Sequence, residues 1–277
     1  MDKKPDFSLK YLEKKAEWVW KETLKIHQRS PETRVASSLS PIEIFVNLYY
    51  GGFLDQDPTN PRWEGRDRCV ISKGHGSLCM YPILADLGYF SMEELNNVCK
   101  EGGVLGGIPD PVIPGYETIN GSLGHGVGVG SGIALAMKRR NMKQQVYVVT
   151  GDGELHEGSN WEAFMFAAQH KLDNLTVIVD NNQISMLGPT DEIVSHRNLV
   201  EKFEAFGWST MEVKAGHSVS AVYGALEVSR NNCIEKPKAL IINTRKGNRV
   251  PGLEGADLSH VTAIDNSLID QLLETKL

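Results

Sequence analysis

Residues 146–182 read VYVVTGDGELHEGSNWEAFMFAAQHKLDNLTVIVDNN, and the fold class can be predicted from this segment. Two short runs rich in apolar and β-branched residues, 146–150 and 175–180, predict buried strands. The segment between them, residues 158–170, predicts a helix. Apolar strands that alternate with helices are typical of a parallel sheet covered by helices on both faces, and we expect an α/β fold of this class.

The same alternation continues outward from this stretch in both directions. We expect further strands at residues 68–72, 209–213 and 239–244. The expected helices are residues 9–27, a helix begun by a capping box at Ser40-Pro-Ile-Glu43, and residues 78–87, 91–100, 197–206, 218–233 and 262–275. The sequence contains no internal repeat and no long linker, so we expect residues 1–277 to form one domain.

Composition and charge exclude several classes of protein. The chain has 277 residues, 29 basic and 35 acidic side chains, and a formal net charge of −6, which argues against a nucleic-acid-binding protein. No run approaches the roughly 18 apolar residues of a membrane span, and the charged N-terminus has no apolar signal-peptide core. The four cysteines are scattered, as reduced thiols in a core would be. We therefore expect a cytoplasmic protein that binds neither nucleic acid nor membrane.

Glycine is over-represented and concentrated in one segment. The chain has 27 glycines, whereas an average usage of about 7% predicts about 19. Eleven of them lie between residues 102 and 132, and those at 124, 126, 128, 130 and 132 alternate. In an isolated helix each would cost up to ~1 kcal/mol relative to Ala. A flexible loop is one interpretation, but we favour a close-packed helix whose face meets another backbone or a cofactor.

Polar residues follow two neighbouring strands of the predicted sheet. Gly151-Asp152-Gly153 ends the first and Asn181-Asn182 ends the second. Ligands of open parallel sheets bind beyond the carboxyl ends of the strands. A carboxylate there repels a phosphate unless a cation lies between them, and oxygen ligands such as those of Asp152 and Asn182 suit Mg²⁺ or Ca²⁺. Either fragment alone favours a simple turn, but the two together favour a site for a metal and a phosphate.

These motifs resemble those of a known family. The string Gly151-Asp-Gly-Glu-Leu-His-Glu-Gly158, followed by Asn181-Asn182, looks like the thiamine diphosphate motif in its transketolase version. Ser72-Lys-Gly-His-Gly76, Gly121-Ser-Leu-Gly-His-Gly126 and His260 fall in the order and spacing of that family. The resemblance covers almost the whole chain. The domain that it resembles is the N-terminal, diphosphate-binding domain of transketolases.

The resemblance implies a metal site and a cofactor site. Asp152, the side chain of Asn182 and the carbonyl of Ile184 would hold Mg²⁺, or Ca²⁺ or Mn²⁺, against the diphosphate of thiamine diphosphate. The residues that match cofactor contacts of the family are His75, Gly121, Leu123, Gly151, Asp152, Gly153, Glu154, Asn182, Ile184 and His260. The matching catalytic residues are His75, His260 and Glu157, the last being a carboxylate at the interface with a partner domain.

The resemblance also implies that this chain works with a second one. In the family, a glutamate that acts on the cofactor's pyrimidine belongs to a pyrimidine-binding domain, which this sequence lacks. We expect that domain and the C-terminal domain on a C-terminal transketolase subunit, in an α2β2 heterotetramer. A natural two-chain enzyme and a truncated longer chain are both conceivable, and we favour the former.

The expected activity is transfer of a two-carbon ketol unit from a ketose, either a phosphate or another anionic sugar, to an aldose. One alternative is a specialised transketolase for a sulfosugar such as 6-deoxy-6-sulfofructose, or for apulose phosphate. Another is a catalytically silent subunit that keeps the cofactor motif for assembly.

Three positions depart from the family pattern. Arg34 and Ile108 stand where transketolases have histidines that contact sugar hydroxyls, and Leu187 stands where an aspartate is common. Arg34 either binds a substrate anion through its two-pronged guanidinium or forms a structural ion pair. We expect His27, His170, His196 and His217 to be surface or packing residues.

Overall fold

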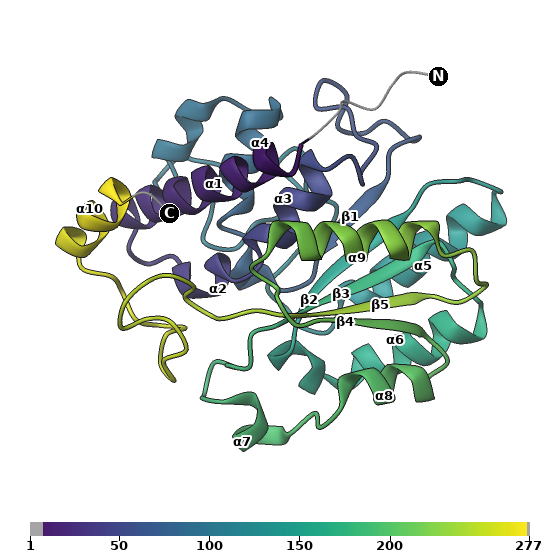
Figure 1. Cartoon of the computed structure of the whole chain (residues 1–277). Coiled ribbons are helices and arrows are strands. Elements are labelled where there is room, and N and C mark those ends of the chain that lie inside the picture. The colour runs from purple at the N-terminus through teal and green to yellow at the C-terminus, as the bar shows by residue number, and fades with distance from the viewer. Residues whose placement is uncertain (1–7, 276–277) are drawn as a thin grey trace.

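The structure, a computed structural model, describes residues 8–275, and these contain one sheet of five parallel strands (Figure 1). The strands are β1 (Arg68–Ile71), β2 (Val146–Gly151), β3 (Leu175–Asn181), β4 (Ser209–Val213) and β5 (Lys238–Asn243). Their order across the sheet is β1-β2-β3-β5-β4, and every neighbouring pair is parallel. All five strands predicted from the sequence are confirmed, with small shifts at their ends.

Helices cover both faces of the sheet, as the apolar strands predicted (Figure 1). One layer contains α1 (Leu9–Arg29), α2 (Val35–Leu39), α3 (Ile42–Tyr50), α4 (Met80–Leu87) and α9 (Val219–Asn231), with α10 (Asn266–Glu274) against α1. The other contains α5 (Gly126–Arg139), α6 (Gly158–Gln169) and α8 (Leu199–Ala205). A short α7 (Thr190–Val194) lies in the connection after β3. Among residues 8–275, no helix has the length and hydropathy needed to cross a membrane.

The strands divide the core into two hydrophobic clusters. In β2, Tyr147 and Val149 belong to the cluster beneath α1, α3 and α9, whereas Val146 and Val148 belong to the one beneath α5 and α6. This follows from the two-residue period of a strand. The connection from β4 back to β5 runs opposite to the earlier ones, so its helix α9 lies on the other face from α5, α6 and α8, as right-handed crossovers require.

Two details of the helices predicted from the sequence are wrong. The capping box at Ser40-Pro-Ile-Glu43 does not form: Pro41 is the N-cap of α3, Ser40 Oγ donates to Asp180 Oδ2 at 2.6 Å, and Glu43 lies 3.0 Å from His217 Nδ1. The Ser40 hydroxyl and the Glu43 carboxylate thus bond to residues distant in the sequence instead of to the backbone at the start of α3.

The second wrong prediction concerns residues 91–100. Ser91 does cap this segment, but it forms only a short 3₁₀ helix, Met92–Asn96. The segment ends early because Cys99 adopts a left-handed conformation, with φ of 58°, and donates its N–H to Leu105 O at 2.7 Å.

Of the alternating glycines, those from Gly126 to Gly132 lie in a close-packed helix, α5, as predicted, whereas Gly124 precedes it with a φ of 82° and residues 102–125 form turns and loops. A Cβ on Gly126 would lie 2.4 Å from Ser72 Oγ, and one on Gly130 would lie 2.4 Å from Val148 Cγ2. Gly128 and Gly132 have nothing within 4 Å of that position. One face of α5 therefore meets the sheet at backbone distance, and the opposite face is exposed on this chain.

A buried polar cluster holds the carboxyl edge of the sheet together. Asp180, the penultimate residue of β3, is fully buried and forms an ion pair with Lys73, which follows β1. It also accepts hydrogen bonds from Ser40, before α3, and from Thr244, after β5. The loops after β1 and β5 and the turn before α3 thus converge on one carboxylate.

The contacts of α5 predict opposite effects for two matched substitutions. Gly130→Ala forces a methyl group against Val148 and should lower the free energy of unfolding by about 1–3 kcal/mol. Gly132→Ala adds the same group in open space and should raise it by up to about 1 kcal/mol through helix propensity. Urea unfolding of the two variants measures both values, and equal effects would contradict the packing described for α5.

Candidate active site

The carboxyl edge of the sheet opens into a pocket of about 360 Å³. Most of the site residues predicted from the sequence line it: His75, Leu123, Gly151, Asp152, Gly153, Glu154, Glu157, Asn182, Ile184 and His260. Gly121, Arg34 and Ile108 lie outside this lining. The structure therefore brings into one cavity side chains from four separate motifs, while their individual roles stay predictions.

Asp152 is a buried carboxylate at the end of β2. Its side chain Oδ2 accepts hydrogen bonds from Gln183 N and Thr190 Oγ1, both at 2.8 Å. Burial raises the pKa of Asp152. Within the described part of the chain, 8–275, it forms no ion pair. A buried carboxylate without a compensating charge is costly, so this residue is suited to a bound cation.

The other two predicted metal ligands lie in the connection that follows β3. Asn182 Oδ1 accepts a hydrogen bond from Ile184 N at 3.1 Å. The carbonyl of Ile184 accepts one from the ammonium of Lys246 at 3.0 Å, so it already faces a positive charge in the pocket. One carboxylate, one amide and one carbonyl oxygen form a donor set of the kind that Mg²⁺ or Ca²⁺ takes. The residues thus fit a hard divalent cation.

No group of three or more His, Cys, Asp or Glu side chains is arranged to hold a metal ion among residues 8–275. This result does not bear on the pocket, because the donor set there includes only one carboxylate.

Lys246 is a site residue that sequence reasoning missed. It follows β5, is 3% exposed, and lines the pocket beside Lys73. Burial, together with the charge of Lys73, lowers its pKa to about 8. Two lysines at this edge offer an anionic group a positive environment. The rule that pointed to Asp152 and Asn182, polar residues after a strand, would have found Lys246 if applied to β5.

Two histidines lie together at the other side of the pocket. The rings of His75 and His260 are 5.0 Å apart between centroids and nearly perpendicular. Burial and the charge of Lys246 lower the pKa of His260 to about 3, and burial lowers that of His75. Near neutral pH both imidazoles are therefore uncharged, and each has a ring nitrogen that can accept a hydrogen bond. Ser37, which the sequence did not single out, lies 3.0 Å from His260 Nδ1 and also lines the pocket.

Arg34 lies next to this histidine pair. Ser38 Oγ donates to the carbonyl of Arg34 at 3.3 Å and to that of His75 at 3.2 Å, which holds the two backbones together. The charge of Arg34 contributes, after burial, to the lowered pKa of His75. Within the described residues, the guanidinium makes no ion pair. This absence argues against Arg34 as part of a structural ion pair and leaves its positive charge available to another partner.

Ile108 is the second departure from the family pattern, and it lies over the glycine loop. Its side chain is 40% exposed, and its Cγ2 is 3.2 Å from the position that a Cβ on Gly121 would occupy. An apolar side chain thus stands beside the segment predicted to contact the aminopyrimidine.

The two glutamates of the motif differ in their environment. Glu154 is buried, and its carboxylate accepts hydrogen bonds from Ser72 Oγ, from Gly124 N at 2.9 Å and from Gly151 N at 3.3 Å. It therefore ties three loops of the pocket together. Glu157 is exposed on this chain and lines the pocket rim.

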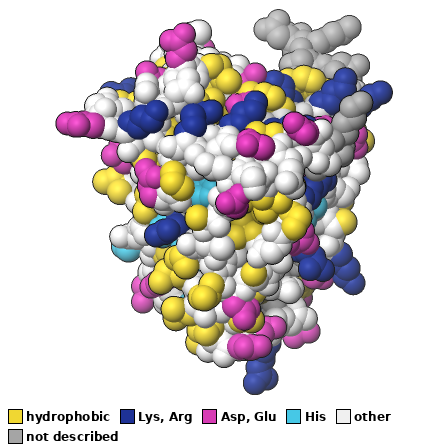
Figure 2. Space-filling view, turned by 90° about the vertical axis from the view of Figure 1, so that its left-hand side faces the viewer, with side chains coloured by type: hydrophobic (Ala, Val, Ile, Leu, Met, Phe, Trp, Pro, Cys, Tyr) yellow, Lys and Arg dark blue, Asp and Glu magenta, His cyan; other side chains and the backbone are white. Residues whose placement is uncertain are grey.

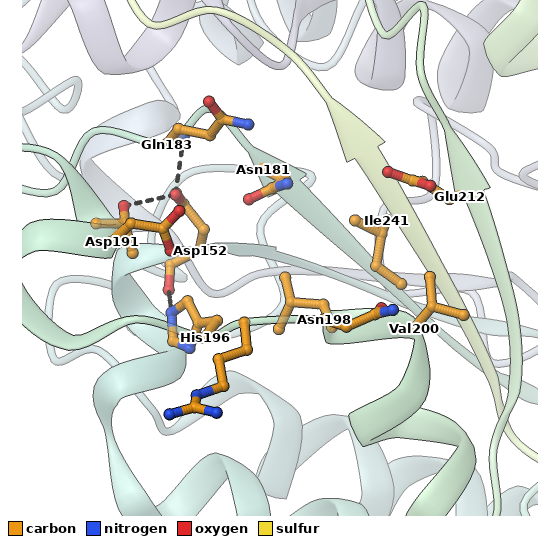
Figure 3. Close-up of a pocket in the computed structure, with 12 residues that line it drawn as sticks. Asp152, Asn181, Gln183, Asp191, His196, Asn198, Val200, Glu212 and Ile241 are labelled. Atoms are coloured by element: carbon orange, nitrogen blue, oxygen red, sulfur yellow. Dashed lines mark hydrogen bonds between the residues drawn. The ribbon is translucent and has the colours of Figure 1, made fainter.

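A second, polar pocket of about 280 Å³ lies on the other side of Asp152 (Figure 3). His196 enters it and donates from Nε2 to the backbone carbonyl of Asp152 at 2.8 Å. We expected His196 to be a packing or surface residue. It is buried, and it also holds the chain at a predicted metal ligand, a role that no feature of the sequence signalled.

Comparison with known proteins identifies the family. The model of the thiamine diphosphate-binding domain of transketolase matches residues 35–276. A subunit of the apulose-4-phosphate transketolase from Actinobacillus succinogenes is 39% identical over 90% of this chain and 90% of its own length. A 6-deoxy-6-sulfo-D-fructose transketolase subunit from a Clostridium species is 37% identical over 82% of each chain.

Longer transketolases share the same region. Human transketolase is 34% identical over 86% of this chain, which spans only 37% of the human protein. The crystal structure of Campylobacter jejuni transketolase superposes on 96% of this chain with a TM-score of 0.89 and 29% identity, and the match covers 43% of that structure. The fold, the motifs and these relatives agree: the chain belongs to the transketolase family and contains its thiamine diphosphate-binding domain.

Proposed function

We propose that the chain is the N-terminal subunit of a two-chain transketolase that binds thiamine diphosphate with a divalent metal and transfers a ketol unit from a ketose to an aldose. The observation that carries this proposal is the pocket itself. It combines the buried carboxylate of Asp152, which has no ion-pair partner among residues 8–275, with the oxygens of Asn182 and Ile184 and with two uncharged histidines. This set fits a metal-bound diphosphate at one end and a reacting sugar at the other.

Some residues of the chain would hold the cofactor and its metal, and others would contact the sugar. When bound, thiamine diphosphate supplies the carbon nucleophile and the electron sink for cleaving a bond next to a carbonyl. Asp152, Asn182 and the Ile184 carbonyl would hold the metal, and Lys246 would add positive charge beside the diphosphate. His75 and His260, both uncharged, would accept hydrogen bonds from the hydroxyl groups of the sugar.

The surface around the pocket supports a partner subunit. Met186, Leu187 and Val261 are exposed by 57%, 70% and 53%, and the first two line the pocket. Figure 2 shows hydrophobic side chains gathered on the lower half of one face. Exposed apolar side chains in such numbers mark interaction surfaces.

We propose that residues 1–277 form a single diphosphate-binding domain. Its partner would be a C-terminal subunit that carries the pyrimidine-binding domain and its catalytic glutamate, in an α2β2 assembly. The two relatives whose names describe them as transketolase subunits support this arrangement, because the chain spans most of their length.

We propose further that the donor is an anionic sugar bound through Arg34. The guanidinium beside His75, which has no ion-pair partner in the described part of the chain, supports this. The names of two relatives, an apulose-4-phosphate and a sulfofructose transketolase, support it as well. A phosphate or a sulfonate would each accept two hydrogen bonds from Arg34. Specialisation for one of those two sugars is therefore the leading alternative to ordinary pentose phosphates.

The metal assignment predicts a loss of cofactor binding in Asp152→Ala. Removing a charged partner from a buried ion contact costs about 3–5 kcal/mol, so the Kd of Mg²⁺ with thiamine diphosphate should rise at least about 100-fold. Calorimetric titration of the chain measures it. Asp257→Ala, which removes an exposed carboxylate, is the matched control and should bind as the parent does. Unchanged affinity in Asp152→Ala would refute the assignment.

The two-chain proposal predicts that activity requires a partner. Ketol transfer should be undetectable for the purified chain and should appear when the chain is co-purified with the subunit that binds it. The assay uses a panel of phosphorylated and sulfonated ketoses. Turnover by the chain alone would contradict the proposal. A complex that binds the cofactor but transfers no ketol unit from any ketose would favour the catalytically silent subunit instead.

The role of Arg34 predicts a selective change in KM. Arg34→Gln loses a charge-assisted contact worth about 1.5–3 kcal/mol, so the KM for an anionic donor should rise about 10- to 100-fold. The KM for an uncharged ketose such as erythrulose should change little, and Arg34→Lys should restore part of the loss. Equal increases for charged and uncharged donors would show that Arg34 does not contact the anion.

A further inference from the structure

The connection after β3, residues 182–198, folds back over Asp152 and contacts both its side chain and its main chain. We propose that Thr190 and His196 are positioning residues that fix the carboxylate of Asp152 for the metal. The inference rests on the proposed function, because it concerns how the cofactor's metal is held. Neither residue is a predicted ligand, and neither was indicated by the sequence.

Two donors from this connection meet the same oxygen of the carboxylate. Gln183 N and Thr190 Oγ1 each lie 2.8 Å from Asp152 Oδ2. Two donors on one oxygen fix the rotation of the carboxylate group, so the other oxygen keeps its lone pairs for a cation. The Thr190 side chain is only 4% exposed, so no bulk solvent competes for this hydrogen bond.

The backbone at Gln183 is strained where it makes this contact. Its φ is 66°, in the left-handed region that non-glycine residues seldom adopt. Gln183 stands between Asn182 and Ile184, two predicted metal ligands. Strained residues persist where the surrounding structure holds them and are concentrated at functional sites. The hydrogen bond to Asp152 is one of the contacts that hold this conformation.

His196 forms a hydrogen bond with the main-chain carbonyl of Asp152. A carbonyl can only accept, so the 2.8 Å contact between His196 Nε2 and Asp152 O fixes the proton on Nε2. The ring stacks on that of His156 at 4.5 Å, and His156 Nε2 donates to Val194 O at 2.7 Å. The two imidazoles thus join the segment after β2 to the connection after β3. Figure 3 shows Gln183 and His196 approaching Asp152 from opposite sides.

The pocket behind Asp152 explains why these hydrogen bonds matter. A side chain in a close-packed core is held by its neighbours, but Asp152 borders a cavity of about 280 Å³ that Thr190 and His196 also line. Packing alone therefore leaves the carboxylate room to turn away from the metal position. The three donors supply the restraint, and since they lie on the segment that carries Asn182 and Ile184, they couple all three predicted ligands.

The test uses two substitutions at each position, one that removes the hydrogen-bond donor and one that keeps it. Thr190→Val and His196→Phe keep shape but lose the donor, whereas Thr190→Ser and His196→Gln keep a donor at each position. Mn²⁺ binding in the presence of thiamine diphosphate is followed through the free-ion signal in electron paramagnetic resonance. Loss of an outer contact to a metal ligand typically weakens metal binding about 10- to 100-fold, which we expect for Val and Phe, with recovery in Ser and Gln.

A second measurement separates positioning from general structure. Urea unfolding of the four variants without metal should rank them differently from Mn²⁺ binding, because Thr190→Ser and His196→Gln lose buried packing and stability but keep the donor. The inference is overturned if the parent binds Mn²⁺ and all four variants bind it equally, and the proposed function then stands. It is also overturned if the affinity losses follow the losses in metal-free stability. A complex of the parent with its partner subunit that binds neither Mn²⁺ nor thiamine diphosphate would refute the proposed function and this inference together.

Discussion

The geometry of the pocket depends on the buried carboxylate of Asp180. Parallel strands bring their carboxyl ends to one edge, but the loops that leave them are free to diverge. Asp180 gathers Lys73 from the loop after β1, Thr244 from the end of β5 and Ser40 from the turn before α3. Those segments continue into the residues that line the pocket. One buried ion contact therefore sets the relative positions of loops far apart in the sequence.

Asp180 and Asp152 end neighbouring strands but have opposite electrostatic environments. Burial acts to raise the pKa of both, but at Asp180 the charge of Lys73 and its hydrogen bonds outweigh burial and hold the pKa below its usual value. At Asp152 burial prevails, and the pKa is raised. One carboxylate is satisfied by an ion pair within the protein, while the other has no ion-pair partner among residues 8–275. This difference is what the proposed metal site at Asp152 requires.

The sequence predicted the sheet and much of the pocket for physical reasons that are local. Strands stand out as short apolar runs, and Asp152 and Asn182 stand out because they follow such runs. What it missed depends on contacts between distant segments. The sequence predicted Ser40 as a helix cap, but its hydroxyl donates a hydrogen bond to Asp180 instead. His196 looked like a packing residue because nothing in its neighbourhood along the chain shows that its ring reaches Asp152 O. No short-range pattern encodes either contact.

We propose that Asp152, Asn182 and the Ile184 carbonyl together hold a metal on a diphosphate. Crystals of the chain grown with Mn²⁺ and thiamine diphosphate, measured at a wavelength where manganese scatters anomalously, test it most directly. We expect one strong anomalous peak within bonding distance of those three oxygens, with diphosphate density beside it and toward Lys246. Manganese bound elsewhere, or a diphosphate in this pocket that contacts no metal, would contradict the account.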